Sequence, residues 1–218
     1  MSEDNTFWPI IHIRDIIDDD FINYKKVSML IAMPYCTFKC NVDGKKLCHN
    51  QELIHSTIVC MTYHKLVERY LNNMCSEAII FAGLEPMVLT KNNTRCVSKF
   101  TLPSYCKWLY DKYNFPLYST SFTDMINFIC LLRIDYRCQD NIVIYSGYTK
   151  EELLDMSNPE HGYIQPIMDI SKYYKGDIII KYGRYLDNNT SHLDPILGVK
   201  LASSNQYAEL YRDGEKIE

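Results

Sequence analysis

Four short apolar runs along the chain predict buried β-strands. They lie at residues 25–34, 77–82, 141–145 and 177–181, and the first of them is closed by Pro34. Apolar runs of this length, bounded by turn residues, are typical of strands in the interior of a sheet. The runs are far enough apart for a helix to lie between consecutive strands.

Helical spacing of apolar residues predicts the connecting elements. It is found in residues 56–74, 102–113, 121–136 and 164–173, and Thr149 is a suitable N-cap for a further helix. Strands that alternate with amphipathic helices indicate an α/β fold with a mostly parallel sheet of repeated βα units. Ligands of such sheets bind at the carboxyl ends of the strands. Three segments follow strands in this way, namely residues 35–51, 83–86 and 146–148.

Composition and charge narrow the class of protein. The chain has 218 residues, 47% of them hydrophobic, and a formal net charge of -4. We expect a single domain over residues 1–218, with a core at about 25–211, an acidic N-terminal extension and a charged C-terminal tail. The chain has no basic field that would attract nucleic acid or anionic lipid, so we expect neither as a partner. The acidic start is unlike a secretory signal, and no apolar run is long enough to cross a bilayer, so we expect a cytoplasmic protein.

Nine cysteines suggest a metal site. Disulfides are rare in the cytosol, and an odd count excludes complete pairing. Cys36, Cys40 and Cys48 share one loop directly after a predicted strand, whereas the other six are scattered among apolar residues and are expected in the core. Thiolates suit iron–sulfur clusters and zinc. Three thiolates on a cubane cluster leave one iron open, whereas structural zinc needs a fourth ligand, for which His49 and His55 are candidates. The loop by itself leaves both alternatives open.

Several motifs carry a resemblance to a known family. The cysteine loop, MPYCTFKCNVDGKKLCHN, is followed by AGLEP at 82–86, VIYSGYTKEEL at 143–153, DIIIKYGRY at 177–185 and SSNQ at 203–206. Together they resemble the radical S-adenosylmethionine superfamily and, within it, the activating proteins of anaerobic ribonucleotide reductases. The matches cover roughly residues 27–211 in the family's order. The chain departs from the family's pattern at two places. Seven residues separate Cys40 from Cys48, where the usual loop is Cys-x3-Cys-x2-Cys. In the AGLEP turn, Ala82 and Leu84 stand where glycine or an acidic residue is usual. Loop closure cost rises slowly with length, so the longer loop is compatible with a shared cluster.

The resemblance implies a fold, two cofactors and a partner. The fold would be a partial (β/α)6 barrel of radical S-adenosylmethionine type. A [4Fe–4S] cluster on Cys36, Cys40 and Cys48 would bind and reductively cleave S-adenosylmethionine, giving a 5'-deoxyadenosyl radical. The substrate would be a glycine of a glycyl-radical enzyme, the anaerobic ribonucleotide reductase, and a flavodoxin-like or other low-potential donor would supply the electron. The residues expected to contact the cofactor are Leu47, His49, Asn50, Gly83, Leu84, Glu85, Ser146 and Gly147.

Two alternatives remain at the level of the sequence. One is a radical enzyme that acts on another glycyl-radical enzyme, a peptide or a small molecule, since the cluster loop and the region 90–120 are long. The other is a non-enzymatic structural protein with a Cys3His zinc site. Metal content and cofactor cleavage distinguish the two classes.

Overall fold

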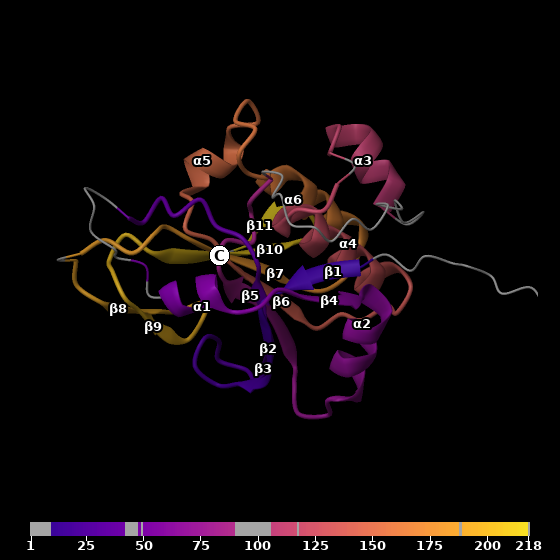
Figure 1. The fold of residues 1–218 in the computed structure, drawn as a ribbon, viewed down its shortest axis with the longest axis horizontal. Helices are drawn as coiled ribbons and strands as arrows, with labels where there is room; N and C mark the ends of the chain where they lie inside the picture. The colour runs from indigo at the N-terminus through magenta and orange to yellow at the C-terminus, as the bar shows by residue number, and fades with distance from the viewer. Residues whose placement is uncertain are drawn as a thin grey trace, which may run out of the picture.

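A seven-stranded mixed sheet organises the described part of the chain (Figure 1). The computed structural model describes residues 10–41, 48, 50–89, 106–116, 118–187 and 189–217. The strand order is β11-β10-β7-β6-β5-β3-β2. The strands are β2 (Asp15–Asp20), β3 (Ser28–Met33), β5 (Ala78–Gly83), β6 (Asn141–Tyr145), β7 (Ile178–Tyr182), β10 (Tyr207–Arg212) and β11 (Glu215–Lys216). The four apolar runs of the sequence supply β3, β5, β6 and β7, which run parallel to one another.

The predicted partial (β/α)6 barrel of mostly parallel repeated βα units is wrong. The sheet is open, because β2 and β11 stand at opposite ends of the strand order, and it is mixed, because β2 with β3, β7 with β10 and β10 with β11 pair antiparallel. The physical reason lies in the connections. Residues 21–27 join β2 to β3, and residues 213–214 join β10 to β11. Short links of this kind make antiparallel neighbours, whereas parallel strands need a long crossover. The two outermost strands, β2 and β11, are rich in charged residues because edge strands are only partly covered.

Helices and two small strand pairs complete the fold. The helices are α1 (Gln51–His55), α2 (Tyr63–Asn72), α3 (Lys107–Tyr113), α4 (Ser121–Ile134), α5 (Lys150–Leu154) and α6 (Ile164–Tyr173). The small pairs are β1 (Ile10–Ile13) with β4 (Val59–Thr62), and β8 (His192–Asp194) with β9 (Val199–Leu201). The helix predicted for residues 56–74 is wrong at its start. Residues 59–62 pair with β1, and α2 begins after the cap Thr62, whose side chain accepts from Lys65 N. None of the described helices is of a length and apolarity that would cross a membrane.

The two faces of the sheet have different packing. Large side chains such as Met29, Ile31 and Phe81 face α2, α4 and α6 and form the larger core cluster. The other face carries smaller residues, among them Ala32 and Ala82, and packs against the β8–β9 segment and α1. Figure 1 shows the β8–β9 pair and α1 on one side and α2, α3, α4 and α6 on the other. Because alanines leave space beside the ends of β3 and β5, a cavity forms on this second face.

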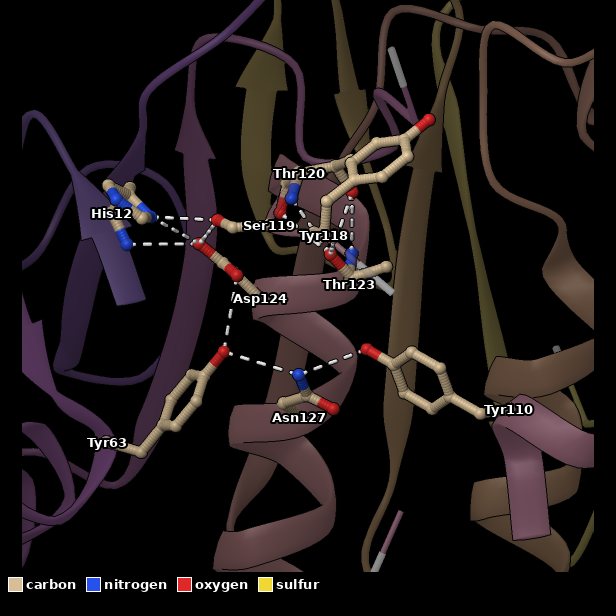
Figure 2. Close-up of polar contacts among 9 residues, drawn as sticks. All are labelled: His12, Tyr63, Tyr110, Tyr118, Ser119, Thr120, Thr123, Asp124 and Asn127. Atoms are coloured by element: carbon tan, nitrogen blue, oxygen red, sulfur yellow. Dashed lines mark hydrogen bonds and ion pairs between the residues drawn. The ribbon is translucent and has the colours of Figure 1, made fainter. Parts of the chain in front are cut away.

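A buried hydrogen-bond network fixes α4 to its neighbours on the helix-covered side (Figure 2). Asp124 Oδ2 accepts from His12 N at 3.1 Å, and Asp124 Oδ1 accepts from Tyr63 OH at 3.2 Å. One turn further along, Asn127 Nδ2 donates to Tyr63 OH at 3.3 Å and to Tyr110 OH at 3.2 Å. None of these side chains lines the cavity. The network therefore joins β1, α2 and α3 to α4 as part of the scaffold.

Candidate functional site

A cavity of about 520 Å³ lies at the carboxyl ends of the four parallel strands. The residues that follow each parallel strand line the wall of the cavity. They are Cys36 after β3, Glu85 after β5, Ser146 after β6 and Arg184 after β7. Ala32 and other residues of the sheet face form its floor. The parallel strands of an open α/β sheet place the segments after them at one edge, which is where ligands of such sheets bind.

The structure brings most of the predicted site residues to this one cavity. The described residues of the predicted set that line it are Cys36, Cys40, Cys48, Asn50, Gly83, Leu84, Glu85, Ser146 and Gly147. Leu47 and His49 lie outside the described residues. His55, the other candidate for a fourth zinc ligand, is exposed at the end of α1 and does not line the cavity.

The three thiols face the cavity in partly buried positions. Burial, followed by the negative charge of Glu85, raises the pKa of Cys36 to about 12. Burial and the neighbouring Cys48 raise the pKa of Cys40 to about 11. Phe38 N donates to Cys36 Sγ at 3.2 Å, and Phe38 has a φ of 54°, which turns the backbone back toward the thiol. Binding of a metal by these thiols therefore requires release of protons.

The chemistry of the three cysteine donors, and not their arrangement, is what suits a thiolate-bound iron–sulfur cluster. Among the described residues, no group of three His, Cys, Asp or Glu side chains is arranged to hold a metal ion. The thiols themselves are soft donors of the kind that bind iron–sulfur clusters, and all three open onto one cavity with room for a second ligand. Three protein ligands are also the number that leaves one iron of a cubane available.

Glu85 joins two of the predicted turns. Glu85 Oε1 accepts from Met87 N at 3.0 Å and from Ser146 Oγ at 2.9 Å, and Glu85 Oε2 accepts from Gly147 N at 2.7 Å. Burial raises the pKa of Glu85, and the hydrogen bonds and the charge of Lys181 oppose that rise. The carboxylate is thus occupied on both oxygens by the protein. It positions the loops after β5 and β6 relative to each other.

Gly83 is required at the end of β5 by its backbone and by its neighbours. Its φ is +79°, and a Cβ there would lie 2.9 Å from the Cβ of Ala32. The Gly83 carbonyl also accepts a hydrogen bond from Asn50 Nδ2. This contact ties the segment that follows the third cysteine to the AGLEP turn, although the two are distant in sequence.

The cysteine loop is also held by the turn after β6. Thr37 Oγ1 and Tyr148 OH lie 3.1 Å apart, and the Lys39 ammonium lies 4.9 Å from the centre of the Tyr148 ring. Lys39 also pairs with Glu160 at 3.4 Å. The segment from Cys36 to Cys40 is therefore fixed by the SGY element of the sequence.

Three cations that were not predicted line the cavity in the described part of the chain, namely Lys181, Arg184 and the exposed Lys200. Lys181, near the end of β7, is buried, lines the cavity and donates to the carbonyl of Gly183. Burial lowers the pKa of Lys181 to about 8, against the raising effect of Glu85. Arg184 binds the Glu152 carboxylate through Nη2 and donates to Gly147 O at 3.2 Å. The sequence signal that could have identified Lys181 is a lysine at the end of an otherwise apolar run. A lysine in such a strand is expected to be buried, and buried lysines are rare without a partner.

Comparisons of the chain with protein-family models, curated proteins and solved structures found no significant match.

Proposed function

We propose that the chain is a radical S-adenosylmethionine iron–sulfur enzyme that generates a glycyl radical on an anaerobic ribonucleotide reductase. One observation carries the proposal. Cys36, Cys40 and Cys48 line the same cavity as the AGLEP and SGY turns, to which the family resemblance assigns the cofactor. These elements are separated in sequence, and all three lie after parallel strands at the edge of the sheet where ligands of α/β sheets bind. We include in the proposal a cytoplasmic location and a flavodoxin-like or other low-potential electron donor.

The residues have distinct roles in this proposal. Cys36, Cys40 and Cys48 would hold a [4Fe–4S] cluster, which would bind S-adenosylmethionine in the cavity that these thiols line. When bound, these two cofactors supply a 5'-deoxyadenosyl radical through one-electron cleavage of the sulfonium bond. Gly83 lines the cavity without a side chain, so its backbone would be able to approach the cofactor closely. Glu85 acts as a positioning residue, because its carboxylate already binds the two turns that form the cavity wall.

The buried surroundings have a second role in radical chemistry. The Glu85 and Lys181 side chains are buried, and the sheet face below them is apolar. A buried and largely apolar wall of this kind limits side reactions of a reactive intermediate with water. The charges of Glu85 and Lys181 offset each other, which leaves the cavity without a large fixed charge at this point.

Anaerobic purification with iron, sulfide and zinc analysis tests the proposal. We expect about four irons per chain, and dithionite-driven release of 5'-deoxyadenosine from S-adenosylmethionine. Cys48→Ala should lose the cluster and the cleavage, whereas the matched control Cys75→Ala, at an exposed position outside the cavity, should keep both. Zinc in place of iron, with no cleavage, would contradict the enzyme proposal. Cleavage without a glycyl radical on the reductase would contradict the choice of partner.

A further inference from the structure

The SSNQ segment, residues 203–206, is a motif to which the proposed function gives no role. It directly precedes β10, whose first residue, Tyr207, lies opposite Tyr182, the last residue of β7. Because these two strands are antiparallel, the residues before β10 lie beside the residues after β7. The segment is therefore next to Gly183 and Arg184, which line the cavity.

Two side chains of the segment hold the turn after β7. Gln206 is buried, and its Nε2 donates to Gly183 O at 3.2 Å. Asn205 Nδ2 donates to Arg184 O at 2.9 Å. The fit is close, because Gly183 has a φ of +88° and a Cβ there would lie 2.8 Å from Asn205 O. The carbonyl groups of both turn residues are thus bound by side chains of the SSNQ segment.

Hydrogen bonds within the segment fix these two side chains. Gln206 Oε1 accepts from Ala202 N and from Ser203 N, both at 3.1 Å. Asn205 Oδ1 accepts from Ser203 Oγ at 2.7 Å, and Ser203 is buried. Each side-chain amide therefore has its oxygen bound inside the segment and its nitrogen directed at the turn, an orientation that these partners determine.

The turn after β7 is bonded to the turn after β6 through both of its residues. Gly183 N donates to Tyr148 O at 2.9 Å, and Arg184 Nε donates to Gly147 O at 3.2 Å. The Arg184 guanidinium also pairs with the Glu152 carboxylate, which orients the arginine side chain. Gly147 and Tyr148 are therefore fixed from the β7 side of the sheet.

Tyr148 links the turn after β6 to the cysteine loop. Its side chain is buried, its OH lies 3.1 Å from Thr37 Oγ1, and the centre of its ring lies 4.9 Å from the Lys39 ammonium. Thr37 and Lys39 belong to the segment between Cys36 and Cys40. One chain of contacts, here called the SSNQ route, therefore joins four separate parts of the sequence, namely residues 203–206, 183–184, 147–148 and 36–40.

We infer that Asn205 and Gln206 are positioning residues for the cysteine loop and that they act through the SSNQ route. Their effect is to keep Cys36 and Cys40 at the cavity before any metal is bound. A loop that is already ordered binds a metal centre more tightly, because the entropic cost of ordering it has been met in the folded chain. The use of these thiols as cluster ligands rests on the proposed function, whereas their positioning is a property of the metal-free chain.

Alkylation of the metal-free chain, resolved for each cysteine by mass spectrometry, tests the inference. Iodoacetamide is the probe. The rates at Cys36 and Cys40, which are partly buried, report opening of the loop. The exposed Cys75 reports the intrinsic reaction, and the buried Cys106 and Cys130 report unfolding of the core. These five cysteines thus separate a local effect from a global one.

We expect Asn205→Ala to raise the rates at Cys36 and Cys40 by about three- to tenfold, because loss of a hydrogen bond increases the population of the open loop. Gln206→Met, which keeps the size of the side chain, should raise them by a similar factor. The rates at the exposed and the core cysteines should stay at their wild-type values. Asn72→Ala, at an exposed position of α2 outside the cavity lining, is the matched control and should change none of the rates.

Tyr148→Phe tests the route, because it removes the contact with Thr37 at the other end. It should itself raise the two loop rates, and Asn205→Ala should add little to them in the Tyr148→Phe background. Two effects that simply multiply would show separate routes and overturn the inference. Loop rates unchanged in Asn205→Ala would also overturn it, and so would equal increases at the loop and core cysteines, which would show support of the whole fold. Raised loop rates in a chain that binds zinc in place of iron would support the inference and overturn the proposed function.

Discussion

Replacing Glu85 tests whether its carboxylate holds the site together. Glu85→Ala removes three hydrogen bonds, from Met87 N, Ser146 Oγ and Gly147 N. Hydrogen bonds to a charged group contribute about 1.5–3 kcal/mol each, but removal also abolishes the cost of burying the carboxylate, which is several kcal/mol. The change leaves the buried Lys181 ammonium without its nearby negative charge. We therefore expect a net loss of about 3–5 kcal/mol in the free energy of unfolding, as for other broken buried charge pairs.

The isosteric substitution makes the expectation sharper. Glu85→Gln keeps the shape and one acceptor oxygen, but its amide NH2 faces a backbone donor, so a loss of about 1–3 kcal/mol is expected. The assay is urea unfolding of the metal-free protein, with the midpoint shift interpreted at constant m-value. Glu52→Ala, at an exposed position of α1, serves as the control and should change stability by less than about 0.5 kcal/mol. A loss below about 1 kcal/mol for Glu85→Ala, or a larger loss for Glu85→Gln than for Glu85→Ala, would refute the reasoning.

Three further predictions concern stability. The pKa of Lys181 is about 8 in the folded protein against 10.5 for the unperturbed group. The folded state therefore releases this proton first, and the stability due to Lys181 rises with pH between these values by up to about 3 kcal/mol. Urea unfolding at about pH 7.5 and about pH 9.5 should show that Lys181→Met lacks this rise, and equal pH slopes in both proteins would contradict the assignment. Asp124→Ala removes an acceptor shared by His12 and Tyr63 and should lower the free energy of unfolding by about 3–5 kcal/mol. The iron content of the folded protein should stay unchanged. Loss of iron without loss of stability would be inconsistent with a scaffold role. Gly83→Ala places a Cβ at positive φ and should lower the melting temperature in line with a loss of about 1–3 kcal/mol, and an unchanged melting curve would show that the turn relaxes without strain.

Local patterns were sufficient for the centre of the fold. The runs at 141–145 and 177–181 became β6 and β7, and the segment 164–173 became α6 with the same bounds. Thr149 caps α5 as predicted, with its side chain accepting from Glu152 N. These elements depend on apolar periodicity and capping, which involve residues close together in the chain. Neighbouring residues therefore contain the necessary information.

The edges of the sheet and the make-up of the cavity depended on contacts between distant residues. The acidic β2 and the polar β10 have weak strand signals, and they become strands because β3 and β7 offer them hydrogen-bonding partners. Glu85 and Ser146 meet across 61 positions, and Lys181 joins them from a third strand. The cysteine loop, the turns and the four central strands could be predicted from local sequence alone. Only the tertiary structure determined that the sheet is open and mixed, and that a buried carboxylate and a buried lysine share the cavity with the thiols. The reason is that burial and strand pairing arise only when separate strands pack together.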